Sequence, residues 1–241
     1  MTKTEISQSG ILRLSISLVA IVLPALLFLR GIYGSFLFTF PIPLLWQIGF
    51  LGRPFGSLGL RATALKSSVI AGIVSGRFLG FLGGNVLKFL GITGRLLSNA
   101  HIVRFDVGPL HAAFSLPNEL GYRLLAISNT PVGLCLYLMF SIFIIGLGEE
   151  LFWRGFLQQK AANYIALDAA IWLTAVLFAL SHFYIFVILP LMPGVAFLIS
   201  IALSGAAWGY LCKYFRNLWA AALSHGITAF IIWKYYFFSL Q

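Results

Sequence analysis

Residues 136–154 read LYLMFSIFIIGLGEELFWR, an apolar run that ends in two adjacent glutamates and an arginine. A helix that crosses a membrane needs about 20 apolar residues, and this run supplies most of one. A carboxylate at membrane depth costs about 3 kcal/mol or more unless it is paired, protonated or hydrated. The chain has only six acidic residues, and it places Glu149 and Glu150 side by side here. These two carboxyl groups are therefore the first candidates for a functional site.

The composition of the whole chain predicts a membrane protein. Its 241 residues are 60% hydrophobic and only 9% charged, with a mean hydropathy of +0.97. Soluble domains carry about 25% charged residues, so the excess of apolar side chains must face lipid. At roughly 20 residues per span, about six to eight helices fit into the chain. We therefore predict an all-α fold, a polytopic transmembrane helical bundle surrounded by the lipid bilayer.

Apolar runs divide the chain into about seven predicted spans. The first follows Lys3 and Arg13 and lacks a clear small-residue cleavage site, so it is interpreted as a retained helix. Pro190 and Pro193 interrupt the sixth run, which could therefore begin only after Pro193. The distribution of Lys and Arg favours a cytoplasmic N-terminus and an outer C-terminus, as expected for a multi-pass protein of a bacterial inner or plasma membrane. The runs lie near 11–29, 32–51, 68–92, 132–157, 163–182, 184–211 and 218–238.

The net charge of +10 does not indicate nucleic-acid binding. The basic residues are scattered singly between apolar runs, and none of the basic clusters or motifs of nucleic-acid-binding proteins is present. Lys and Arg residues that flank membrane spans set the orientation of the protein. We therefore expect no nucleic-acid partner.

Two segments of the N-terminal half have open interpretations. Gly72, Gly76 and Gly80 recur every four residues, which indicates either a close helix–helix contact or a loosely packed interfacial helix. The segment 93–131 is a long polar connection, and such a connection is a lid, a substrate-facing element or a disordered link. Its two histidines, at positions 101 and 111, are expected to be exposed loop residues.

The spacing of the charged residues after the apolar run separates the roles of the two glutamates. Glu150 and Arg154 are four residues apart, so they face each other on a helix and form an expected structural pair. Glu149 points about 100° away, and Trp153 rather than a cation occupies the position one turn later. A buried carboxyl group without a basic neighbour is suited to exchange a proton near neutral pH. Glu149 is therefore the catalytic candidate and Glu150 the supporting residue.

Two histidines in later runs could approach Glu149. The fifth run closes with Phe178 to His182, and the seventh carries His225. A Glu and a His around one water form a hydrolytic unit, and membrane peptides are natural substrates for it. Each His alone is more commonly a satisfied core residue, and Glu149 alone could be a helix-packing carboxyl. Burying these groups together without a function is expensive, which favours the hydrolytic interpretation.

Two other chemical classes compete with this interpretation. Glu with two His residues matches a zinc hydrolase in kind of ligand, but the H-E-x-x-H spacing is absent. We therefore predict no metal and no other cofactor. A proton-coupled transporter would also bury Glu and His, but it usually has internal repeats, and we find none.

Three motifs in order resemble the CAAX-protease and bacteriocin-processing family of intramembrane glutamic endopeptidases. The family motif EExxxR matches residues 149–154, FxxxH matches residues 178–182, and the family's final-helix His matches His225. The similarity covers about residues 132–235. One position departs from the family pattern, because Ala229 stands where relatives often have Asn.

The resemblance implies an intramembrane endopeptidase that hydrolyses a peptide bond of a membrane-associated protein or peptide. It implies that Glu149 activates the water with His182 and that His225 helps to bind the oxyanion. Glu150, Arg154 and Phe178 are the implied supporting residues. Without the Asn, the loss of one oxyanion donor costs about 10²–10³ in rate. Thr228, or Ser224, could replace that donor.

The resemblance also divides the chain and leaves an alternative open. Residues 1–131 are expected to hold N-terminal transmembrane helices and the long polar loop, and residues 132–241 the catalytic helix core. A non-catalytic membrane protein of the same fold, such as a bacteriocin immunity or scaffold factor, is favoured by Ala229. A zinc-dependent membrane protease is the further alternative.

The depth of the candidate residues in the membrane sets a condition on the catalytic interpretation. If the fourth helix ended near Phe156 and the fifth began near Asn163, Glu149 and His182 would differ in depth by about 10 Å or more. The interpretation therefore requires the fourth helix to continue towards Ala162, or the fifth to begin late or tilt. We expect the first of these.

Overall fold

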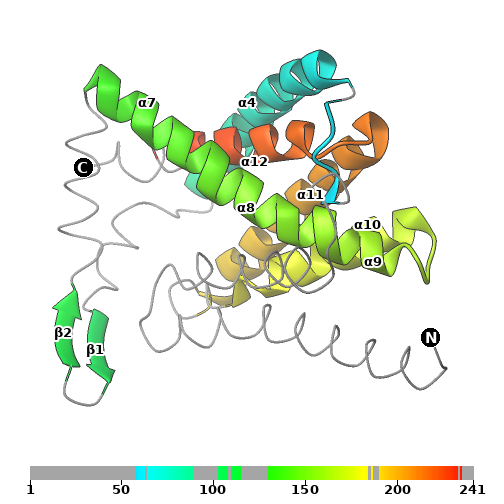
Figure 1. The fold of residues 1–241 in the computed structure, drawn as a ribbon. Helices are drawn as coiled ribbons and strands as arrows, with labels where there is room; N and C mark the ends of the chain where they lie inside the picture. The colour runs from blue at the N-terminus through cyan, green and yellow to red at the C-terminus, as the bar shows by residue number, and fades with distance from the viewer. Residues whose placement is uncertain are drawn as a thin grey trace.

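The last helix, α12 (Trp219–Ile231), lies between helices from three other parts of the chain. It packs against α4 (Leu65–Phe89) on one side and against the middle of a long helix, Pro131–Ala161, on another, and α11 (Leu191–Phe215) also contacts it (Figure 1). α10 (Leu167–Leu180) packs against α11. The computed structural model describes residues 58–62, 64–89, 103–107, 110–114, 130–183, 186, 190–232 and 234.

The prediction of a helical membrane protein is confirmed within the described residues. Three helices are long and apolar enough to cross a membrane, namely α4, Pro131–Ala161 and α11. α10 and α12 are shorter apolar helices. These five correspond to the third to seventh predicted runs. The runs near 11–29 and 32–51 lie outside the described residues, so the total of about seven spans stays a prediction.

The long helix combines α-helical and π-helical segments without a break. It begins with Pro131, and the side chain of Thr130 caps it by accepting a hydrogen bond from the backbone N–H of Gly133 at 3.0 Å. Because it ends at Ala161, the expectation that the fourth helix continues towards Ala162 is confirmed. Its segments are α7 (Pro131–Phe140), η4 (Ser141–Gly146), α8 (Leu147–Glu150), η5 (Leu151–Gln158) and α9 (Gln159–Ala161).

The two helices that follow form an antiparallel pair on one side of the bundle (Figure 1). α11 begins directly after Pro190, so Pro193 lies inside its first turn, where a proline is tolerated. The helix ends at Phe215, and the capping residue Arg216 has left-handed backbone angles (φ 53°). Near this end, Lys213 Nζ donates to Asp168 Oδ1 of α10 at 2.6 Å. Both partners are largely exposed, so this ion pair contributes little to stability.

One element departs from the all-α prediction. Strand β1 (Val103–Val107) pairs antiparallel with β2 (Leu110–Phe114), with Val103 opposite Phe114 and Val107 opposite Leu110. The hairpin lies inside the segment 93–131, which the sequence predicted to be a lid, a substrate-facing element or a disordered link. β-Branched and aromatic residues in β1 favour such a strand.

Glycines allow α4 and α12 to approach closely. Gly72, Gly76 and Gly80 are buried on one face of α4, so the close-contact interpretation of their spacing is confirmed. A Cβ atom at Gly76 would lie only 2.8 Å from the carbonyl oxygen of Ser224 and 2.9 Å from Cβ of Ile227. The hydroxyl of Thr228 donates to the carbonyl oxygen of Gly76 at 3.2 Å. This contact fixes the position of α12 and of every side chain that α12 carries.

The close contact predicts the effect of a single added methyl group. Gly76→Ala should lower the free energy of unfolding by about 1–3 kcal/mol, because the Cβ would press on the backbone of α12. Gly148→Ala is the matched control, since a Cβ there meets nothing within 4 Å, and it should be neutral or stabilise by up to about 1 kcal/mol. Unfolding in mixed detergent micelles measures both. Equal effects of the two substitutions would contradict the packing described here.

Candidate functional site

The two glutamates lie in the short helical segment α8, which is flanked by the π-helical segments η4 and η5. π-Helical turns are rare, and they are common at functional sites because they displace side chains from regular helical positions. η4 also brings the helix against α12, where a Cβ at Gly146 would lie 2.7 Å from the backbone nitrogen of Gly226. This contact places both glutamates beside the residue that precedes Gly226, His225.

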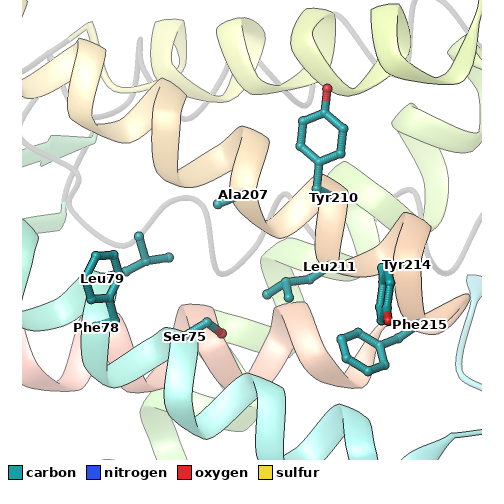
Figure 2. A pocket seen from close by; sticks show the side chains of 8 residues that line it. All are labelled: Ser75, Phe78, Leu79, Ala207, Tyr210, Leu211, Tyr214 and Phe215. Carbon is teal, nitrogen blue, oxygen red and sulfur yellow. The ribbon is translucent and has the colours of Figure 1, made fainter.

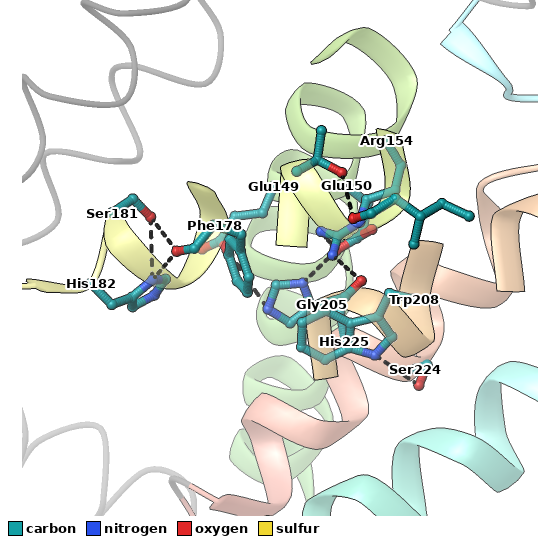
Figure 3. A network of polar contacts seen from close by, with 12 residues as sticks. Glu149, Glu150, Arg154, Phe178, Ser181, His182, Gly205, Trp208, Ser224 and His225 are labelled. Atoms are coloured by element: carbon teal, nitrogen blue, oxygen red, sulfur yellow. Dashed lines mark hydrogen bonds and ion pairs between the residues drawn. The ribbon is translucent and has the colours of Figure 1, made fainter. Parts of the chain in front are cut away.

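Glu150 is completely buried and belongs to a chain of charged hydrogen bonds. Its Oε1 accepts from Nη1 of Arg154 at 2.8 Å, so the pair predicted from the four-residue spacing is confirmed. Nη2 of the same guanidinium donates to the carbonyl oxygen of Gly205 on α11. The pair thus links the long helix to α11 in the interior of the bundle (Figure 3).

His225 contacts both glutamates, one with each ring nitrogen. Its Nδ1 lies 2.9 Å from Oε1 of Glu150, and its Nε2 lies 3.7 Å from Oε2 of Glu149. Glu149 is only 7% exposed. Glu149 has no cation one turn away on its own helix, but a histidine from α12 lies beside it. The sequence predicted that these two residues could meet, and the structure brings them together.

Acidic and basic groups alternate within this cluster. The carboxylate of the Glu150–Arg154 ion pair accepts hydrogen bonds, so Nδ1 of His225 is the donor to Glu150. The other ring nitrogen, Nε2, faces Glu149. Close pairing of acidic with basic groups is the arrangement that buried ionisable groups require.

Aromatic rings enclose the imidazole of His225. The indole of Trp208 stacks on it with 3.9 Å between ring centroids and 12° between planes. Phe178 meets it edge-on at 5.7 Å. Phe178 and Trp208 also belong to a buried apolar cluster with Phe152, Trp153 and Phe156. The polar cluster therefore lies in surroundings of low polarity, which strengthens its electrostatic interactions.

His182 joins the site through Phe178. It lies in the turn after α10, where its Nδ1 is 2.8 Å from the carbonyl oxygen of Phe178 and 3.3 Å from Oγ of Ser181. Its ring packs edge-on against Phe178 at 4.9 Å, so the Phe178 ring contacts both histidines. Figure 3 shows His182 and His225 on opposite sides of the Phe178 ring. The FxxxH spacing therefore places the Phe one turn before the His, in contact with it.

Thr228 has a different role from the one expected for an oxyanion donor. Its hydroxyl proton is directed at the carbonyl oxygen of Gly76 on α4. Thr228 follows His225 by three residues on α12, so its side chain could have faced the site. The close approach of α4 instead provides an acceptor, the carbonyl oxygen of Gly76, on another side of α12. The hydroxyl thus holds two helices together.

Sequence reasoning missed Trp208 and Gly205. Both lie on α11, whose apolar run has no charged residue before Lys213. Gly205 contributes its backbone carbonyl oxygen, which accepts from Arg154, and no side-chain pattern reveals such a contact. Trp208 has one sequence signal, because a tryptophan among small residues in a membrane helix needs a partner for its N–H. That partner is Oγ of Ser224, at 3.1 Å.

An apolar pocket of about 460 Å³ lies between α4 and α11, away from the polar cluster (Figure 2). Ser75, Phe78 and Leu79 line it from α4, and Ala207, Tyr210, Leu211, Tyr214 and Phe215 line it from α11. On α11 these residues lie on a helix face turned away from Gly205 and to one side of Trp208, as 100° per residue places them. The pocket and the polar cluster are thus separate features.

The donor atoms of the described residues do not form a three-ligand metal site. Within these residues, no group of three His, Cys, Asp or Glu side chains is placed to hold a metal ion. Glu150 is already bound to Arg154 and His225. The zinc ligand set suggested by residue types alone is therefore not assembled in this part of the chain.

The C-terminal part of the chain is similar to a known protein family. The family model for type II CAAX prenyl endopeptidases, Rce1-like, matches residues 131–231. The match begins with α7 and ends with α12, and it includes every residue of the polar cluster described above. No curated protein and no solved structure matches the chain.

Proposed function

Residues 131–231 belong to the Rce1-like family of type II CAAX prenyl endopeptidases, and from this premise we propose an intramembrane endopeptidase. In this proposal the protein hydrolyses a peptide bond of a membrane-associated protein or peptide, and a water molecule activated by Glu149 is the nucleophile. The observation that carries the proposal is the position of His225 between Glu149 and Glu150, with Arg154 neutralising the second glutamate. A purely structural ion pair would not need Glu149.

Glu149 is the general base of the proposed reaction. It takes a proton from the water as the oxygen attacks the scissile carbonyl, and it passes that proton to the leaving amine. His182 orients the water. Because the Phe178 ring packs edge-on against His182, the imidazole of His182 must reach the water past the edge of that ring. Glu150, Arg154 and Phe178 support the site by holding His225 and excluding bulk water.

His225 binds the oxyanion in the proposed mechanism. Since Nδ1 donates to Glu150, a donor for the oxyanion requires a proton on Nε2, the ring nitrogen that faces Glu149. The negative charge that develops on the carbonyl oxygen then meets a cation in a site of low dielectric, where such interactions are strongest. Relatives supplement this donor with Asn, and this chain has Ala229 at that position.

The second candidate function is that of a non-catalytic membrane protein with the same fold, and Ala229 is the observation that favours it. The hydroxyl of Thr228, which could have replaced the missing donor, is bound to Gly76. An immunity or scaffold factor would keep the buried ion pairs for stability and would not cleave peptides.

We propose the same division of the chain and the same location as the sequence suggests. Residues 1–131 hold N-terminal transmembrane helices and the connecting segment, and residues 132–241 hold the catalytic core. The protein is multi-pass and belongs to a bacterial inner or plasma membrane. The apolar helices α4, Pro131–Ala161 and α11 support this assignment.

A cleavage assay separates the two functions. The full chain is reconstituted in phospholipid vesicles with a peptide that carries a farnesylated C-terminal CAAX sequence, and mass spectrometry detects the released tripeptide. Release of the product supports the endopeptidase, and no release from this peptide or from unmodified membrane peptides supports the non-catalytic function. Inhibition by a chelator with recovery on adding zinc would assign a metalloprotease instead.

The role of His182 predicts a large loss of activity with little loss of stability. His182→Ala should lower kcat by about 10²-fold, because a positioned acid–base group typically contributes at least that much. Its ring lies at the end of α10 and is only half-buried, so the thermal unfolding midpoint in detergent should change by no more than a few degrees. Unchanged kcat in a folded variant would remove His182 from the mechanism.

A further inference from the structure

Trp208 covers one face of the His225 imidazole, and the family motifs in this chain do not include it. The two rings are almost parallel, with centroids 3.9 Å apart. The indole N–H donates to Oγ of Ser224, the residue directly before His225. Trp208 is therefore attached to α12 at two adjacent points, through its ring face and through its nitrogen (Figure 3).

We propose that Trp208 is a positioning residue for His225, which keeps Nε2 of the imidazole directed at Glu149. This inference rests on the proposed endopeptidase function. The bond from Nδ1 to Glu150 fixes one atom of the ring, but it leaves the ring able to rock about that atom and about its Cβ–Cγ bond. The indole blocks this motion on one face of the ring, and the edge of Phe178 limits it on another side.

The indole also contacts Arg154, whose guanidinium carbon lies 5.6 Å from the centroid of the Trp208 ring. The face of an indole attracts cations more strongly than the face of any other side-chain ring. One indole therefore contacts both basic groups of the cluster. An aliphatic side chain at this position would provide neither the rigid face nor the attraction.

Substitutions at Trp208 test the positioning role through kcat. Trp208→Leu should lower kcat for peptide cleavage by about 10–100-fold with KM within about twofold of wild type, because displacement of a reacting group by about 1 Å can cost 10²-fold. Trp208→Phe keeps an aromatic face and should stay within about threefold of wild type. Trp172→Leu is the matched control, since Trp172 is an exposed tryptophan on α10. It should leave kcat unchanged.

A second measurement does not depend on activity. In protein labelled with ¹⁵N at histidine, the Nδ1–H that binds Glu150 should give a low-field proton resonance, which His225→Gln assigns by its loss. We expect this resonance to remain in Trp208→Phe and Trp172→Leu and to broaden or disappear in Trp208→Leu. Trp208→Met provides a non-aromatic side chain that fills irregular space more easily, and it replaces the leucine variant if that variant does not fold.

The outcomes separate this inference from the proposed function. A non-aromatic variant that folds and keeps both wild-type kcat and the low-field resonance overturns the positioning role, and so does a Trp208→Phe variant as damaged as Trp208→Leu. If the wild-type protein cleaves nothing, the endopeptidase proposal fails. In that case the resonance alone decides whether Trp208 holds His225.

Discussion

Replacing Glu149 by Gln is expected to lower kcat for peptide cleavage by about 10³-fold or more. The amide has nearly the same shape as the carboxyl group, but it cannot take a proton from water, and general-base catalysis typically contributes 10²–10⁴-fold. The substitution also removes the negative charge that faces Nε2 of His225 at 3.7 Å. Measurement of kcat with the vesicle-reconstituted protein and the farnesylated peptide tests this expectation.

The control for this substitution is Asp168→Asn, which removes one carboxylate from the exposed ion pair with Lys213. It changes the net charge by the same amount and should leave kcat at the wild-type value. Full cleavage by the Glu149→Gln protein would end the proposal that Glu149 activates the water. Equal loss in both variants would attribute the effect to charge rather than to chemistry.

Removing Arg154 is expected to have the largest effect on stability. Arg154→Met should lower the free energy of unfolding by about 3–5 kcal/mol, because it leaves the completely buried Glu150 without its cation. It also deprives the carbonyl oxygen of Gly205 of its donor. Methionine fills much of the space of the arginine side chain, so the effect reports the charge more than the volume. Unfolding in mixed detergent micelles measures it.

A matched substitution and a double variant make this test specific. Lys213→Met breaks the largely exposed pair with Asp168 and should cost less than about 1 kcal/mol. Adding Glu150→Gln to Arg154→Met should recover part of the loss, since no unpaired charge then remains in the interior. Comparable losses from Arg154→Met and Lys213→Met would contradict the buried geometry.

The parts of the site that depend on spacing along one helix could be predicted from the sequence. Glu150 and Arg154 are four positions apart, a spacing that defines a pair on one helix face, whatever the rest of the protein does. Phe178 and His182 have the same spacing, which places their two rings in contact for the same reason. The glycines of α4 indicated close packing as one of two interpretations, because small residues allow membrane helices to approach each other.

The parts that depend on how helices face each other could not be predicted. The sequence suggested that His225 approaches Glu149, but not that it also binds Glu150. That bond follows from the close approach of Gly146 and Gly226, which belong to different helices and carry no pairing signal. The binding of Thr228 to Gly76 depends on a helix that the sequence did not connect with α12. The π-helical segments around the glutamates also have no residue signature.

The close approach of α4 to α12 has a consequence for where this protein can be cut. The family match begins at residue 131, whereas α4 ends at Phe89. A shortened protein that started at Pro131 would lose the carbonyl oxygen of Gly76, which accepts the hydrogen bond from Thr228. It would also expose the face of α12 that packs against the glycines of α4. The smallest portion able to fold as described must therefore extend upstream at least as far as Leu65, well before the start of the family match.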